Sequence, residues 1–348
     1  MLTALISNFL KLSNTKFTLL ITVLIILKNG VHPIGTDWID WVYLASANFP
    51  EATNYLSNSV FPMYISRLIE YPTYLIWWVI FTLLTILFYI FLSIKIKNIY
   101  GSNYKIALLS FLIFPFTYIP LYYIGHYDLL TIFGAILAGL TRKKTIVVLG
   151  VCFAAGANPE QALVTSICVA LLSIGTRSKW HRFVAIVWFS CSVLSLAMLR
   201  LFVGKPSTGN RIESIIGQID SVFFNSLGLT HILIFSVFSS GWVVLYILGF
   251  QEVSKTRNIM VISAVVIIPA SLAILILDHT RVGVAVSALP LIIFLKHYLT
   301  PEFFNLINSR YPKPEHLLFL VLFTPSVVVD VGGNLRLPYL ELIRWIMI

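Results

Sequence analysis

Long apolar segments separated by short polar breaks run through almost the whole chain. A helix that crosses a bilayer needs about 20 mostly apolar residues. Segments of this kind are centred near residues 20, 84, 113, 132, 150, 168, 192, 240, 268, 289 and 322. The pattern therefore predicts an all-α integral membrane protein with about 11 transmembrane helices, in a single polytopic domain over residues 1–348.

Composition agrees with this pattern. Hydrophobic residues make up 58% of the chain and charged residues only 11%, and the mean hydropathy is +0.91, far above the usage of soluble domains. The net charge of +10 is scattered over loops, whereas a nucleic-acid site gathers basic residues on one face. We therefore expect membrane lipids, and no nucleic acid, among the partners.

Charges sort between the two sets of loops. With an odd number of spans, one set holds 16 of the 24 basic residues and the other holds 11 of the 14 acidic residues. By the positive-inside rule the basic set is cytoplasmic. We expect a multi-pass protein of the inner (plasma) membrane with a cytoplasmic N-terminus, and polar chemistry on the periplasmic or extracellular face.

The longest predicted outer loops cover about residues 30–72 and 204–229, and loops of this length are usually functional. Asp37 and Asp40 follow Thr36, and three-residue spacing places them on one helix face. A carboxylate at the water boundary suits a general base that takes a proton from a sugar hydroxyl. The alternative is that both acids only complement the dipole of the helix.

Two short breaks carry further candidates. His126 and Asp128 lie in YIGHYDLL between two spans, and ionisable groups at membrane depth are functional candidates because burying them is costly. In GANPEQAL the Asn-Pro pair predicts a helix start with Glu160 in its first turn. For Asp128 and Glu160 the alternative is a turn-capping or helix-capping role.

A later outer break, LDHTRVG, contains Asp278, His279 and Arg281. Arg281 stands on the side where basic residues are rare, and an arginine near a histidine can hold a phosphate bidentately. The alternative is a salt bridge from Arg281 to Asp278 or to another outer acid. Weaker candidates for the phosphate role are Arg67, Lys205, Arg211 and Arg336.

The first loop and the break between the third and fourth spans together resemble a known superfamily. The chain is similar to the GT-C polyprenyl-phosphate-dependent glycosyltransferases in several motifs. In and after the first loop these are WIDWVYLASA after Asp37, then Tyr55, Pro62, Tyr64 and Pro72, then Trp77 and Trp78. The turn GHYD at residues 125–128 follows later. The nearest pattern is the bacterial polytopic alpha-mannosyltransferase family of the phosphatidylinositol-mannoside type. Where that family has Lys-Pro, this chain has Asn158-Pro159-Glu160.

The resemblance implies an inverting membrane glycosyltransferase, with Asp37 as general base and Asp40 as the second choice. Its partners would be a polyprenyl-phosphate-linked sugar donor and a lipid-linked or glycan acceptor. It implies no cofactor, and a divalent ion between outer carboxylates stays an open alternative. Two other functions remain: a surface-polysaccharide polymerase that uses undecaprenyl-diphosphate-linked units, and a lipid or glycan flippase.

Overall fold

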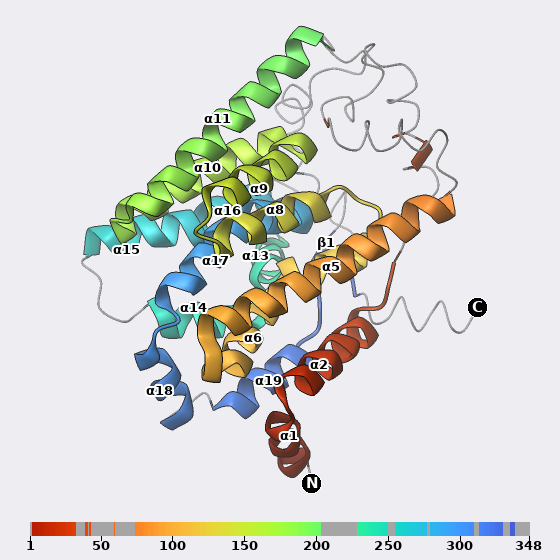
Figure 1. The fold of residues 1–348 in the computed structure, drawn as a ribbon, viewed down its shortest axis with the longest axis vertical. Coiled ribbons are helices and arrows are strands. Elements are labelled where there is room, and N and C mark those ends of the chain that lie inside the picture. Colours follow the sequence, from red (N-terminus) through yellow and green to blue (C-terminus); the bar gives the residue numbers. More distant parts are fainter. Residues whose placement is uncertain are drawn as a thin grey trace.

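The computed structural model describes residues 2–32, 39–40, 42, 59, 74–202, 228–249, 255–276, 279–309, 313–329 and 335–337. Most of both predicted outer loops lies outside this range. The helices of the described part, shown in Figure 1, are α1 (Leu2–Lys11), α2 (Asn14–Asn29), α5 (Tyr74–Tyr100), α6 (Tyr104–Leu112), α7 (Ile119–Tyr122), α8 (Asp128–Leu140), α9 (Lys144–Ala157), α10 (Pro159–Thr176), α11 (Lys179–Phe202), α13 (Thr230–Phe238), α14 (Trp242–Gly249), α15 (Lys255–Ile262), α16 (Ile268–Leu275), α17 (His279–Tyr298), α18 (Pro301–Ser309) and α19 (Pro314–Phe323).

Within the described residues, five helical segments are long and apolar enough to cross a membrane. They are Leu75–Leu112, Pro159–Thr176, Lys179–Leu201, Thr230–Leu248 and Thr280–Tyr298. Four shorter apolar helical segments accompany them: Asp128–Leu140, Lys144–Ala157, Ile259–Leu275 and Pro314–Phe323. The helical class and the presence of membrane-length helices are confirmed, whereas the count of about 11 spans stays a prediction.

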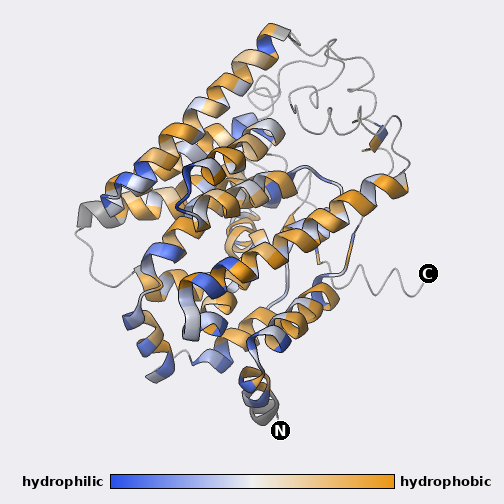
Figure 2. Cartoon of the chain, in the orientation of Figure 1, coloured by the Kyte–Doolittle hydropathy of each residue, from blue (hydrophilic) through white to orange (hydrophobic). Residues whose placement is uncertain are grey.

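Burial separates a central helix from peripheral helices. In the most apolar window of α17, 89% of the residues are buried, against 28% in α11 and 33% in the segment that begins with α5. α17 packs against α8, α10 and α16. Figure 2 shows that α5 and α11 are largely apolar, and both carry large exposed apolar side chains, among them Leu83 and Leu194, as expected of helices that face lipid. α17 is therefore the helix around which the others assemble.

Several predicted spans are not continuous helices. The span predicted near residue 113 ends as α6 at Leu112 and continues through a 3-10 turn over Pro115–Thr117 into the four-residue α7. Pro115 and Pro120 explain the break, because proline lacks the N–H that an α-helix needs. The span near residue 240 is divided where Ser239 takes φ 51°. The span near residue 268 contains a π-helical turn, Ser263–Ile267.

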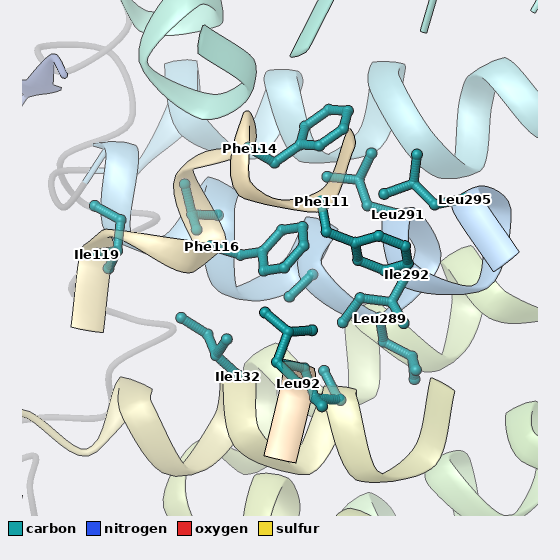
Figure 3. Packing of buried hydrophobic residues seen from close by; sticks show 14 of the residues in the cluster. Leu92, Phe111, Phe114, Phe116, Ile119, Ile132, Leu289, Leu291, Ile292 and Leu295 are labelled. Atoms are coloured by element: carbon teal, nitrogen blue, oxygen red, sulfur yellow. The ribbon is translucent and has the colours of Figure 1, made fainter. Parts of the chain in front are cut away.

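The interrupted segment from α6 to α7 contributes aromatic side chains to the core. Figure 3 shows Phe111 and Phe116 packed toward Leu289 and Ile292 of α17, and Phe114 on the side of Leu291. The three phenylalanines and these α17 residues are completely buried. Short helices with turns between them place large rings at angles that one straight helix would not allow, and the core is closed on this side by aromatic packing.

α8 and α9 approach closely because glycines face each other. A Cβ on Gly134 would lie 2.2 Å from the carbonyl oxygen of Gly150, and a Cβ on Gly150 would lie 2.5 Å from the carbonyl oxygen of Gly134. Both distances are shorter than real Cβ contacts, so any side chain would push the helices apart. Small residues at such a crossing are typical of helices that pack in membranes.

Lysine side chains donate hydrogen bonds to carbonyls at the C-terminal ends of other helices. Nζ of Lys105 donates to the carbonyl of Leu10 at 2.6 Å, next to the end of α1. Nζ of Lys296 donates to the carbonyls of Gly139 at 3.0 Å and Thr141 at 3.3 Å, at the end of α8. Helix C-termini leave carbonyls unpaired and carry partial negative charge, which a lysine satisfies. Both lysines belong to the loops predicted to be cytoplasmic.

The only strands in the described part are β1 (Val328–Val329) and β2 (Leu335–Arg336), which pair antiparallel. A two-residue pairing does not form a sheet layer, so the architecture remains helical. β1 contacts α17 and α13. The backbone N–H of Val329 donates to Oγ1 of Thr280 at 2.8 Å, and the Thr280 hydroxyl donates to Oγ of Ser236 at 2.6 Å.

Candidate functional site

Three helices begin at one buried place. α8 begins at Asp128, α10 begins immediately after Asn158, and Arg281 lies in the first turn of α17. Contacts between their side chains, described below, show that these N-terminal ends meet. Each helix N-terminus carries partial positive charge and N–H groups that have no partner within the helix. Their convergence favours negative charge at this point.

Asp128 is the centre of the cluster. Its Oδ2 lies 2.8 Å from Nε of Arg281 and 2.9 Å from Nδ1 of His126. The carboxylate is 1% exposed, His126 is 2% exposed and Arg281 is 7% exposed. A buried charge persists only when it is paired, so this ion pair holds two charges that neither residue could bury alone. The alternative predicted for Arg281, a salt bridge to another outer acid, is therefore present, and the acid is Asp128.

Asn158 joins α10 to the cluster. Its Nδ2 donates to Oδ1 of Asp128 and to Oγ1 of Thr131, both at 2.9 Å. The neighbouring carboxylate determines how the amide is oriented, because the reverse orientation would place two oxygens together. Asn158 is completely buried, and within the described residues its Oδ1 has no hydrogen-bond partner. A buried acceptor without a donor is rare and costly.

A second amide oxygen follows on α10. Oε1 of Gln161 is also buried without a hydrogen-bond partner in the described part of the chain. Gln161 follows Asn158 by three residues, so both lie on the same face at the start of the helix. Glu160 is half-buried in the first turn of α10, as the Asn-Pro break predicted. The start of α10 thus carries two buried amide oxygens for which the described residues supply no hydrogen-bond donor.

Aromatic rings surround the cluster. Cζ of Arg281 lies 5.9 Å from the ring centre of Tyr123, and the rings of His126 and Tyr127 are 4.3 Å apart. Nε1 of Trp77 donates to the carbonyl of Gly125 at 2.8 Å. Gly125 takes φ 101°, a conformation that other residues rarely adopt. The glycine turn and its anchor on α5 thereby place His126 against Asp128.

The structure brings together only some of the predicted site residues. His126, Asp128 and Arg281, taken from two separate breaks of the sequence, are in direct contact. Asp40 is exposed on a short helical stretch beside the buried Ile39. His279 is the first residue of α17, and its side chain is outside the described part. Asp37, Asp278 and Arg211 also lie outside the described residues, as do Arg67 and Lys205.

Four contributors were not predicted as site residues: Thr131, Asn158, Gln161 and Tyr123. Thr131 follows Asp128 by three residues, a spacing that places both on one helix face and was available from the sequence. Gln161 follows the predicted helix start in the same way. The position of Tyr123 under Arg281 had no local signal, because the two residues come from distant parts of the chain. No group of three or more His, Cys, Asp or Glu side chains suited to a metal ion occurs among the described residues.

Comparisons of the chain with protein-family models, with curated proteins and with solved structures gave no match. The fold and the site define a class: a helical protein with membrane-length helices that encloses a buried, charged cluster where three helices begin.

Proposed function

We propose that this protein is a membrane glycosyltransferase that moves a sugar from a polyprenyl-phosphate donor to a lipid-linked or glycan acceptor at the outer face. The observation that carries the proposal is the buried cluster itself. It combines an arginine and a histidine with amide acceptors at the N-terminal ends of three helices. A phosphate-linked sugar needs both kinds of group, positive donors for the phosphate and acceptors for the hydroxyls.

The arginine is held for phosphate binding by its carboxylate partner. Asp128 contacts Nε on the inner edge of the Arg281 guanidinium, and the Nη1 and Nη2 edge is the one that grips two phosphate oxygens. In this proposal Asp128 positions Arg281 and His126 rather than contacting the phosphate. The helix N-termini add to the positive potential. Groups fixed in this way stabilise charge that develops on the leaving phosphate.

The chemical step is a single displacement. The acceptor hydroxyl oxygen bonds to the anomeric carbon while the bond from that carbon to the phosphate oxygen breaks. The hydroxyl proton passes to the carboxylate of Asp37 or Asp40, and the lipid phosphate leaves with the bonding electron pair. Attack from the opposite side inverts the anomeric centre. Asp37 remains the first choice as base because of the resemblance, and Asp40 remains the second.

Sugar transfer by the purified protein in nanodiscs tests the proposal. Radiolabelled polyprenyl-phosphate hexose is offered beside a lipid-diphosphate oligosaccharide. We expect transfer from the monophosphate donor, loss of transfer in Asp37→Asn, and a fall in kcat/KM on the order of 100-fold in Arg281→Lys. Arg142→Lys, at an exposed position between α8 and α9, is the matched control and should keep full activity.

Two other results would replace the proposal. Chain growth from the diphosphate donor alone would identify a surface-polysaccharide polymerase. No transfer from either donor, by protein whose elution and thermal unfolding are normal, would leave lipid or glycan transport as the function. Equal losses in Arg281→Lys and Arg142→Lys would remove Arg281 from the phosphate site.

A further inference from the structure

A groove of about 540 Å³ lies between α2 and α5, and its lining does not include Asp128, His126 or Arg281 of the buried cluster. Sites for small molecules usually measure ~300–1,000 Å³. Side chains that line the groove are strongly exposed along its opening, including Leu19 at 70% and Ile90 at 50%, so it opens sideways from the protein. Its lining runs from Asn14, Lys97 and Tyr104 at one end to Val31, Leu121 and Ile124 at the other.

The walls of the groove are apolar although several threonines line it. Oγ1 of Thr18 donates to the carbonyl of Asn14 at 2.7 Å, and Oγ1 of Thr85 donates to the carbonyl of Phe81 at 2.8 Å. The hydroxyl of Tyr89 donates to the carbonyl of Thr117. These hydroxyls are turned onto the backbone, so carbon atoms face the groove. Such walls suit a hydrocarbon chain and do not suit a sugar or an ion.

The groove is long and narrow. Its lining residues on α5 extend from Thr82 to Lys97, which corresponds to about 22 Å at the rise of an α-helix. Each leaflet contributes roughly 15 Å to a hydrocarbon core of about 30 Å. The groove can therefore hold one lipid chain from a leaflet along its full depth.

One end of the groove is positively charged. The segments 2–20 and 90–112, which lie toward this end, contain five lysines and no acidic residue. Lys105 is occupied with the end of α1, whereas Lys97 lines the groove, is exposed, and has no ion-pair partner among the described residues. A lysine beside a chain-sized groove attracts a lipid with an acidic headgroup.

We propose that the groove between α2 and α5 binds an anionic phospholipid, with one acyl chain along the groove and the phosphate beside Lys97. The lipid comes from the leaflet at the basic face. This site is separate from the glycosyl-transfer chemistry and stands or falls independently of it. The lipid would occupy the space between α2 and α5 and connect α2 to the rest of the protein.

Native mass spectrometry of the full chain tests this site. The protein is released from vesicles that contain equal amounts of phosphatidylglycerol and phosphatidylcholine, and the lipids retained are counted. We expect phosphatidylglycerol to be retained preferentially, and the preference to fall about fivefold in Lys97→Gln. Thr22→Phe, which fills the groove from α2, should remove the retained lipid.

Matched variants control for general effects. Lys95→Gln removes a lysine from the same helix, where Nζ lies 5.1 Å from the ring centre of Phe91 and outside the groove. Leu87→Phe adds a ring at an exposed position of α5 that does not line the groove. Both controls should bind lipid as the original protein does. Equal loss in Lys95→Gln and Lys97→Gln, retained lipid in Thr22→Phe, equal retention of both lipids, or a lipid-free dimer would each overturn the proposal.

Discussion

The ion pair between Asp128 and Arg281 gives the sharpest stability prediction. Three variants are compared: Asp128→Asn, Arg281→Met and the double variant. Each single change leaves one charge in a site where Asp128 is 1% and Arg281 is 7% exposed, with its partner group gone. Removing one member of a buried pair typically costs about 3–5 kcal/mol.

For this pair we expect the loss of unfolding free energy to lie at the lower end of that range. In Arg281→Met the carboxylate keeps His126 and Asn158 at 2.9 Å, so we expect a loss of about 3 kcal/mol of unfolding free energy. We expect a similar loss in Asp128→Asn, where the guanidinium faces a neutral amide. The double variant buries no unpaired charge and should lose no more than about 3 kcal/mol. The coupling energy is then about 3 kcal/mol.

The assay is unfolding by SDS titration in mixed micelles, followed by tryptophan fluorescence. Arg142→Met, at an exposed position, serves as control and should change stability by no more than about 0.5 kcal/mol. If the losses of the two single variants add to the loss of the double variant within about 0.5 kcal/mol, the pair is not coupled and the reasoning is refuted.

Three further predictions use the same assay. Gly150→Ala should lower the free energy of unfolding by about 1–3 kcal/mol, because its Cβ would lie 2.5 Å from a backbone oxygen of α8. Gly228→Ala, whose Cβ would have nothing within 4 Å, should leave the free energy of unfolding unchanged. Lys296→Met should lower the free energy of unfolding by about 1–3 kcal/mol, because the carbonyls at the end of α8 lose their donor. Lys143→Met, at an exposed position before α9, should leave the free energy of unfolding unchanged. Asn158→Leu should lose about 2–3 kcal/mol by removing two buried hydrogen bonds, and stability equal to the unchanged protein would contradict that role.

Hydropathy predicted the helices well but not their internal breaks. Each predicted centre lies within a helical segment or next to one, because apolar runs of this length have few other structures open to them in lipid. The break after Leu112 was visible in Pro115 and Pro120, whose effect is local. The π-helical turn at Ser263–Ile267 directly precedes Pro269, which cannot donate an N–H to the carbonyl of Val265, so this irregularity also had a local signal.

The members of the cluster were predicted better than their partners. His126 and Asp128 stood out because ionisable residues at membrane depth are rare, and Arg281 stood out because basic residues are rare in the predicted outer loops. Helix packing determines which of the polar breaks lie next to each other. A single sequence does not show that α8 and α17 begin side by side. The partners that the sequence could name for Arg281 were local, Asp278 and His279, and the other acid left open as an alternative is Asp128.

Because α17 lies at the centre of the helices, its late position in the sequence determines when the helices can finish packing. Asp128 leaves the ribosome long before Arg281, by roughly 10–30 s at a synthesis rate of about 5–20 residues per second. During this time the carboxylate has no arginine, and the hole that α17 will fill must be closed by lipid, by water or by another protein. The first helices can pair as they emerge, as α8 does with α9, but the charged centre is assembled only after Arg281 has been synthesised.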